Sequence, residues 1–410
     1  MVDSVILTFD LPPTGLLAQA TSATEVDLTW SDNSDYDSGY EVERRAASGS
    51  FQRIATLAAN ATAYTDGNAS PSTTYEYRVR GLNAAGFTAY SDITTTTTPP
   101  DTAPRPLGSV TAVAADPSRL GYAYAASADV GLIVFDVSAA ASPRAVAAAA
   151  LPVSSQPAGL KVSGDLAVIP ARHVVAVYDL GEPTAPVRVA TITVPAVDVA
   201  IMGDYLYLCD EYNGLVTFDV SDPWNPRQQA TVLPVMGYEM DVAGGDIWVA
   251  ALSELRGVAT QPPWSPSLLG FVPTSICQVV CGTPAHAFVF SGAALRVIDV
   301  ADPLRPLEVG SLTTDAVRLT SLSALNQQVC ATWYYQALAS RGLWMYDVSD
   351  PTRPVLLSNV WTQGGAYDVS AIEVGPHDKR CYVADGTAGF TVVDVTDPTR
   401  PRVVGNCRTM

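Results

Sequence analysis

Apolar residues occupy alternate positions along short segments of the first hundred residues. Residues 26–30 and 75–79 show this most clearly, with valine, leucine, tryptophan or tyrosine at every second position. A period of two places these side chains on one face of a β-strand, as in the half-buried strands of a sandwich. Segments rich in Asp, Asn, Ser and Gly at 32–39, 65–72 and 83–86 indicate the turns between strands. The first hundred residues therefore predict a β-sandwich without helices.

A different regularity governs the chain after residue 102, where one pattern of strand and proline-rich turn occurs seven times. The copies are GLIVFDVSAAASPR (131–144), VVAVYDLGEPTAPV (174–187), GLVTFDVSDPWNPR (214–227), RGVATQPPWSPS (256–267), ALRVIDVADPLRPL (294–307), GLWMYDVSDPTRPV (342–355) and GFTVVDVTDPTRPR (389–402). Two alternating segments precede the quoted strand in each unit and one follows it, so each unit contains four strands. Four strands in 40 to 48 residues are typical of one blade of a β-propeller. The sequence therefore predicts seven four-stranded blades.

The aspartate that precedes each turn has a structural explanation. Its carboxylate can accept a hydrogen bond from the backbone N–H two residues later, while proline presets φ for the turn. A second proline enters the outer strand near its start, where an edge position tolerates it. The fourth copy has Ala259 in place of the aspartate. We interpret the repeated aspartates as scaffold residues and not as catalytic acids.

Residues 10–98 resemble a bacterial fibronectin type III domain. The resemblance rests on PPTGLLAQATSATEVDLTWSDNSDYDSGYEVERR and on YEYRVRGLNAAGFTAYS. It implies that Trp30 is the core tryptophan and that Tyr75 is a tyrosine corner, whose hydroxyl returns to nearby backbone. It also implies an extracellular context, because this module is common in extracellular carbohydrate-active and adhesive proteins. No RGD tripeptide is present, so integrin binding does not follow.

The strings GLWMYDVSDPTRP and CYVADGTAGFTVVDVTDPTRP resemble the LVIVD repeat family of bacterial and archaeal β-propellers. The resemblance is strong in five copies, weaker in the second and poor in the fourth. It implies a seven-bladed propeller, commonly found in surface or secreted multidomain proteins, and it implies no particular chemistry.

The expected fold class is all-β, a fibronectin type III sandwich followed by a seven-bladed propeller. We expect an N-terminal strand or tail at 1–9, the sandwich at 10–98, a Thr/Pro linker at 99–107 and the propeller at 108–410. Each blade is complete in itself, so the ring is expected to close without exchange of a strand between the termini. The segment PRPLGSV (104–110) could supplement the closing seam.

Charge narrows the range of partners. The chain has 23 basic against 41 acidic residues and a net charge of −18, which repels nucleic-acid phosphates and anionic lipids. We expect no nucleic-acid partner. Apolar runs fall short of the roughly 20 residues of a membrane helix, so no membrane insertion is expected. The first residues, MVDSVILTFDLPP, lack the features of a signal peptide and leave the export route open.

Catalytic and metal-binding motifs are absent from the sequence, which has no GxSxG, HExxH, Walker loop or CxxC. Cys277 and Cys281 share a strand face about 13 Å apart, too far for one metal ion. Cys381 and Cys407 lie two strands apart in the last blade, about 9–10 Å, beyond the reach of a disulfide. The acidic loop at 32–37 reads as a solvated turn. We assign no catalytic residue, metal or cofactor, and we expect folding that needs neither metal nor disulfides.

A binding surface is expected where the loops between second and third strands gather on one face of the propeller. Aromatic and charged side chains in these loops have the character of a recognition patch. The candidates are Asp210, Glu211, Tyr212, Tyr334, Tyr335, Arg341 and Asp385. Trp224 and Trp264 lie in the proline turns on the opposite face and form a second candidate patch.

The expected function is a non-enzymatic binding or assembly protein, secreted or at the cell surface, that contacts protein or polysaccharide or copies of itself. One alternative is a glycan-active hydrolase or lyase, because carboxylates from separate blades can meet in the channel. Another is a structural subunit of a filament, sheath or tail-like particle, with the strand DSVILTF (3–9) pairing with an exposed edge.

Overall fold

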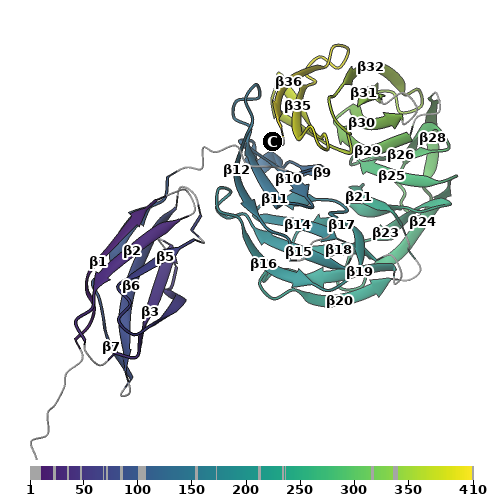
Figure 1. Ribbon diagram of the computed structural model, residues 1–410. Coiled ribbons are helices and arrows are strands. Elements are labelled where there is room, and N and C mark those ends of the chain that lie inside the picture. Colours follow the sequence, from purple (N-terminus) through teal and green to yellow (C-terminus); the bar gives the residue numbers. More distant parts are fainter. Residues whose placement is uncertain are drawn as a thin grey trace, which may run out of the picture. The chain divides into compact units, whose positions relative to one another are not determined.

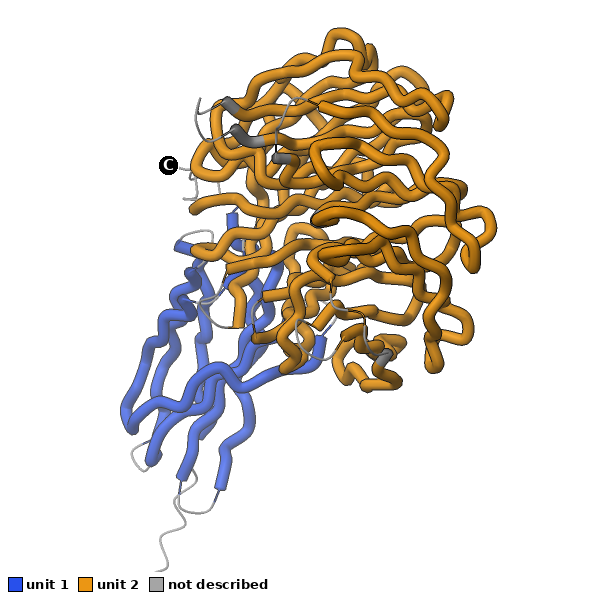
Figure 2. Tube along the Cα trace, turned by 90° about the vertical axis from the view of Figure 1, so that its right-hand side faces the viewer, with its two compact units in different colours: residues 1–103 blue, residues 104–410 orange. Residues whose placement is uncertain are grey.

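The computed structural model divides the chain into two compact units, residues 1–103 and 104–410, which are described separately (Figure 2). It describes residues 11–408 apart from short internal segments. These segments are 22–24, 35–36, 47–48, 68, 71–72, 84–85, 100–107, 153–155, 172, 211–213, 233–234, 236, 315–317, 336–339. The expected N-terminal strand at 3–9 and the linker from residue 100 onward therefore lie outside the described residues. Within these described residues, the regular structure is β, except for the 3-10 turn η1 (Pro117–Arg119).

Unit 1 is a sandwich of two antiparallel sheets (Figure 1). One sheet has the order β1-β2-β5, and the other has the order β4-β3-β6-β7, with β8 also paired to β6. The strands are β1 (Thr14–Ala20), β2 (Val26–Ser31), β3 (Gly39–Ala46), β4 (Gln52–Ala58), β5 (Ala63–Asp66), β6 (Thr74–Asn83), β7 (Gly86–Tyr90) and β8 (Thr94–Thr97).

The sandwich core confirms both residues that the resemblance singled out. Trp30 is buried and packs against Tyr40, with ring centroids 5.8 Å apart. The backbone N–H of Ser70 donates to the hydroxyl of Tyr75 at 2.9 Å, which is the expected tyrosine corner. The alternation read from the sequence thus places the large apolar side chains between the two sheets.

On the outer face of the second sheet, arginine, glutamate and aromatic side chains form a network of contacts. Arg78 bonds the buried carboxylate of Glu43 and lies 3.8 Å from the ring centroid of Tyr90. Arg80 bonds Glu41 in the same way, with an Nη2–Oε2 distance of 2.7 Å. Because cations on aromatic faces and paired carboxylates stabilise each other, these charges can sit on a largely covered surface.

Unit 2 contains seven four-stranded antiparallel sheets in the part of the chain that is described, and Figure 1 shows them arranged as the blades of a ring. The first three are β9 (Val110–Ala114), β10 (Tyr122–Ser127), β11 (Gly131–Asp136), β12 (Arg144–Ala149); β13 (Lys161–Ser163), β14 (Leu166–Ala171), β15 (Val174–Asp179), β16 (Val187–Ile192); β17 (Ala196–Met202), β18 (Tyr205–Asp210), β19 (Gly214–Asp219), β20 (Arg227–Val232). We number the blades 1 to 7 in chain order.

The other four blades follow the same plan. They comprise β21 (Glu239–Ala243), β22 (Asp246–Ala250), β23 (Glu254–Ala259), β24 (Ser267–Pro273); β25 (Cys277–Gly282), β26 (His286–Ser291), β27 (Ala294–Asp299), β28 (Leu307–Thr313); β29 (Arg318–Leu325), β30 (Gln328–Tyr335), β31 (Ser340–Asp347), β32 (Val355–Trp361); β33 (Asp368–Gly375), β34 (Asp378–Ala384), β35 (Phe390–Asp394), β36 (Arg402–Cys407). The prediction of an all-β chain with a fibronectin type III sandwich and a propeller of four-stranded blades is confirmed.

The repeated turn has the local chemistry expected from the sequence. The Oδ1 atom of Asp219 accepts from the backbone N–H of Ser221 at 2.9 Å, two residues later. A second turn follows, in which the backbone N–H of Trp224 donates to Asp222 at 3.1 Å. Blade 4 lacks the first aspartate, and there the N–H of Thr260, the residue directly after Ala259, donates to the side chain of Asp246.

The turns of blades 1 and 6 also contact the preceding blade in the ring, and a glycine makes room for each of them. A Cβ atom on Gly310 of β28 would overlap the carbonyl oxygen of Pro351, in the turn of blade 6. A Cβ atom on Gly405 of β36 would overlap the carbonyl oxygen of Ala140, in the turn of blade 1. The close approach of backbone to backbone therefore requires glycine at both positions.

The ring closes by side-by-side packing of blades 7 and 1, each built from consecutive strands. Phe135 of β11 stacks on Phe390 of β35 with centroids 4.2 Å apart. The guanidinium of Arg380 donates to the carbonyl of Val137 at 2.9 Å. Val110, the last residue of PRPLGSV, forms an isolated antiparallel bridge with Gly386 of blade 7. The described end of this segment therefore contributes one contact to the seam.

We predict that Gly405→Ala and Gly310→Ala each destabilise the propeller by about 1–3 kcal/mol, because an added Cβ forces the neighbouring turn to move. Denaturant unfolding, followed by tryptophan fluorescence, measures the effect. Gly375→Ala is the matched control, because a Cβ atom there meets open space. Equal stability of all three variants and the wild type would contradict the proposed docking of turns.

Candidate functional site

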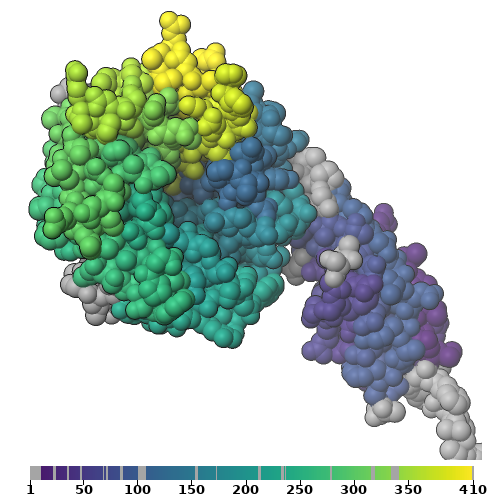
Figure 3. Space-filling view, turned by 180° about the vertical axis from the view of Figure 1, so that it is seen from behind, coloured from purple at the N-terminus to yellow at the C-terminus, as the bar shows by residue number. Residues whose placement is uncertain are grey.

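A polar cavity of about 700 Å³ lies at the centre of the propeller. The innermost strands of all seven blades, β9, β13, β17, β21, β25, β29 and β33, contribute to its wall. The space-filling view shows the blades around a central depression (Figure 3). Blades diverge from a common axis, so their first strands cannot fill the centre completely, and a channel remains.

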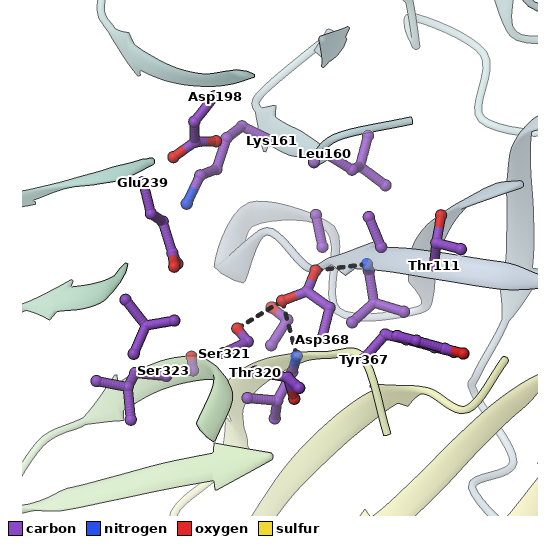
Figure 4. A pocket seen from close by; sticks show the side chains of 18 of the residues that line it. Thr111, Leu160, Lys161, Asp198, Glu239, Thr320, Ser321, Ser323, Tyr367 and Asp368 are labelled. Carbon is purple, nitrogen blue, oxygen red and sulfur yellow. Dashed lines mark hydrogen bonds between the residues drawn. The ribbon is translucent and has the colours of Figure 1, made fainter. Parts of the chain in front are cut away.

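Five charged residues meet in this channel, one lysine and four carboxylic acids. They are Lys161, Asp198, Glu239, Asp241 and Asp368. The Nζ atom of Lys161 lies 3.9 Å from Oδ1 of Asp241, and about a third of each side chain is exposed. Figure 4 shows the Lys161 side chain extending toward Asp198 and Glu239, with Asp368 farther away beside Ser321. Because both side chains are partly exposed to water, this ion pair contributes little to stability.

Three of these carboxylates also connect neighbouring blades. Each accepts a hydrogen bond from a backbone N–H on or next to the innermost strand of the next blade. The bonds run from Met240 N to Asp198 Oδ2 (2.7 Å), from Gly282 N to Asp241 Oδ2 (2.9 Å) and from Val113 N to Asp368 Oδ2 (2.9 Å). Asp368 accepts a further bond from the hydroxyl of Ser321 at 2.6 Å. The channel carboxylates are therefore positioned by the assembly of the ring.

Burial and mutual repulsion change the acidity of the cluster. Burial disfavours charge on Lys161, but the neighbouring carboxylates, Asp241 first among them, raise its pKa, so the ammonium stays charged. Burial raises the pKa of Asp198 to about 6. Burial also raises the pKa of Glu239 well above its ordinary value, and the nearby Asp198 carboxylate acts in the same direction. Asp198 and Glu239 therefore bind a proton more tightly than isolated carboxylates do.

Two tyrosines stand at the mouth of the channel. Tyr238 and Tyr367 immediately precede Glu239 and Asp368, and each is about half exposed. Their backbone N–H groups donate to carbonyls at the ends of second strands, from Tyr238 to Ala250 and from Tyr367 to Ala384. These contacts place both rings on the face where the loops between second and third strands gather.

The predicted residue Asp385 lies beneath this same face and is fully buried. Its carboxylate accepts bonds from the Thr362 and Thr391 hydroxyls and from the backbone N–H groups of Gln363 and Ala366. It thereby shapes the connection from blade 6 to blade 7, which leads into Tyr367. Asp385 therefore holds the backbone next to the channel mouth in place and is not itself exposed there.

The other predicted residues are distributed differently. Asp210 ends β18 and is 2% exposed, so its carboxylate is not presented on the surface. Arg341 lies in β31 and donates to the carbonyl of Gly364 at 3.1 Å. Tyr334 and Tyr335 end β30, and their side chains lie outside the described part of the structure, as do residues 211–212, which are Glu211 and Tyr212.

Sequence reasoning did not single out the channel residues. A usable signal was present, because three first strands carry the same Asp-Val pair at 198–199, 241–242 and 368–369. A polar residue repeated on the first strand of several blades points toward the propeller axis. Lys161 carried no comparable signal, because β13 has only three residues.

The remaining sequence candidates behave as separate features. Trp224 and Trp264 are 62% and 60% exposed at equivalent turn positions of blades 3 and 4, and Leu304 of blade 5 continues this row at 68%. Cys277 and Cys281 are both buried. Within the described residues, no group of three or more His, Cys, Asp or Glu side chains has a geometry that could hold a metal ion. No helix in the described structure is long and apolar enough to cross a membrane.

Comparison with known proteins agrees with this architecture. The fibronectin type III domain family model matches residues 11–97, and the LVIVD repeat model matches 121–148, 195–233, 333–362 and 379–409. The matched repeats belong to blades 1, 3, 6 and 7. Blades 2, 4 and 5 have the same four-stranded topology outside the matched residues.

One curated relative is Exoglucanase B of Cellulomonas fimi, which is 32% identical over 135 residues. That match covers 30% of this chain and 12% of the relative, so the chain spans about an eighth of the relative's length. A fibronectin type III-like protein from Clostridium thermocellum is 29% identical, with a TM-score of 0.20, over 22% of this chain and 94% of that structure. A chain of the mitotic checkpoint complex is 12% identical, with a TM-score of 0.49, over 72% of this chain and 88% of that one.

The tyrosine corner of unit 1, the four-stranded blades of unit 2 and the two matching family models lead to one description. This chain combines an N-terminal fibronectin type III domain with a β-propeller of LVIVD repeats.

Proposed function

We propose that this chain is a non-enzymatic extracellular or cell-surface protein that binds a partner at the mouth of the propeller channel. The observation that carries the proposal is a cavity of about 700 Å³ with Lys161 and four carboxyl groups inside and two tyrosines at its entrance. Cavities of roughly 300–1,000 Å³ suit small molecules or short chain segments. The fibronectin type III domain and LVIVD repeats support an extracellular binding or structural role.

The chemistry of the channel favours a ligand that donates hydrogen bonds. Carboxyl oxygens outnumber the single ammonium group, so the site suits hydroxyl, ammonium or guanidinium groups. The faces of Tyr238 and Tyr367 offer stacking to a sugar ring or to a cation. A polysaccharide segment or a basic side chain of a surface protein meets both requirements.

The test of binding is a glycan array and a panel of basic peptides, followed by calorimetry with the full chain. We predict that Tyr367→Ala weakens binding of the selected ligand at least tenfold, because it removes the stacking surface, a loss of about 1.4 kcal/mol. Trp264→Ala is the matched control, because it removes an exposed aromatic ring from the opposite face. Failure of every probe to bind, or an equal loss in both variants, would refute a channel-mouth site.

Binding of a basic peptide is predicted to weaken as the pH falls from 7.5 to 5. The pKa of Asp198 is raised to about 6, so acidification through that value protonates the carboxyl and removes a negative charge from the channel. Calorimetry at both pH values measures the effect, and Asp198→Asn should show a smaller pH dependence. Binding that strengthens on acidification would contradict the proposed charge complementarity.

A glycan hydrolase or lyase is the second candidate, and the raised pKa of Glu239 specifically favours it. Burial raises the pKa of Glu239, and a carboxylic acid with a raised pKa can act as a general acid beside an ionised carboxylate. Our proposal predicts binding of glycans without turnover, measured by release of reducing ends. Turnover that is lost in Glu239→Gln and retained in Trp264→Ala would establish the enzyme and overturn the non-enzymatic role.

A further inference from the structure

Two cysteines from different blades meet in the interior of the propeller. Cys330 lies in β30 of blade 6 and Cys381 in β34 of blade 7, and both are completely buried. Their Sγ atoms are 2.9 Å apart, closer than two sulfur atoms in ordinary van der Waals contact. Met345 and Val383 belong to the same apolar cluster, which fills the interface between these blades.

The geometry distinguishes this pair from the other cysteines. A disulfide bond is about 2.05 Å long, so the two sulfur atoms need to approach by only about 0.9 Å. Cys277 and Cys281 share one strand and cannot reach each other. Cys209 occupies a second strand in blade 3 and donates to the carbonyl of Gly237 at 3.4 Å.

We propose that Cys330 and Cys381 form an inter-blade disulfide when the chain folds in an oxidising environment. The bond is a covalent modification site at the interface of blades 6 and 7, and it is independent of any ligand in the channel. Formation joins Sγ of Cys330 to Sγ of Cys381, and the two thiols lose two protons and two electrons. A small-molecule disulfide such as glutathione disulfide accepts them, and its own S–S bond breaks to give two molecules of thiol.

Because both thiols are buried in the folded propeller, the disulfide has to form before folding is complete. Exchange requires a thiolate, and burial raises the pKa of Cys381 well above its ordinary value. An oxidant also has no path to a side chain without exposed surface. The bond is therefore expected to form while blades 6 and 7 are assembling, before their interface excludes water.

The cross-link would constrain the last blade. The two residues are 51 positions apart, so the bond closes a loop that contains the end of blade 6 and the first half of blade 7. Closing a long loop restricts the unfolded chain and so stabilises the folded one. Blade 7 completes the ring against blade 1, so this loop ends close to the seam on which closure depends.

The experiment refolds the full chain in a glutathione redox buffer and, in parallel, in excess dithiothreitol. Each product is denatured without reductant, alkylated with iodoacetamide and weighed by mass spectrometry. The chain has six cysteines, so we expect six labels on the reduced product and four on the oxidised one. Peptide mapping should find the segments containing Cys330 and Cys381 linked, and the oxidised product should melt about 5 °C or more above the reduced one.

Single cysteine variants show whether the higher melting temperature of the oxidised product comes from the disulfide bond or from packing of the side chains. Cys330→Ala and Cys381→Ala should each abolish the difference in melting temperature between oxidised and reduced products. Cys209→Ala, which empties an equally buried second-strand position, should retain it. Six labels on the natively folded product from redox buffer would overturn the proposal, and so would a linked peptide that joins Cys330 to Cys281. The wild-type label count decides the question if a variant does not fold.

Discussion

Packing of each blade against its two neighbours is the constraint on which the propeller depends. The middle strands are buried on both faces, as in β11 and β15, so an isolated blade would expose an apolar sheet on each side. Only a closed ring removes all of these surfaces from water. The stacked rings of Phe135 and Phe390, in the first and last blades, show that the seam between the termini has the same apolar character as the other interfaces.

The same constraint creates the channel and selects its polar residues. First strands crowd toward the axis, and a backbone N–H at that position needs an acceptor from the adjacent blade. Asp198, Asp241 and Asp368 each supply that acceptor with one oxygen, and all three residues also line the cavity. The second oxygen of Asp368 accepts from Ser321 and Val369. A side chain that joins two blades thus also contributes to the wall of the channel. The channel is rich in carboxyl groups because the same aspartates that connect the blades also line its wall.

Blade 4 shows how much of the repeat pattern the fold can lose. It has no aspartate before its turn, and its proline segment follows a different sequence. The hydroxyl of Tyr207 in blade 3 donates to the carbonyl of Thr260, and Asp246 accepts the N–H of the same threonine. Contacts from the adjacent strand β22 and from the neighbouring blade therefore hold this segment, where the local aspartate turn is missing. A repeat can diverge in sequence when contacts from other strands hold its turn.

The elements that depend on local order in the chain could be predicted before the fold was known. Strand alternation, the aspartate-proline turns, Trp30 and Tyr75 were all read correctly, because each depends on residues close together in the chain or on a regular period. Asp210 and Asp385 show where prediction from the sequence ends. Their charge suggested an exposed position on the loop face, but in the structure both side chains are buried beneath that face. From the sequence, Cys407 of the same blade was considered as a disulfide partner for Cys381. The cysteine that lies next to Cys381 in the structure is Cys330 of the adjacent blade. Only the closed ring decided which carboxylates share a channel with Lys161 and which thiols touch, because closure brings together side chains that lie far apart in the chain.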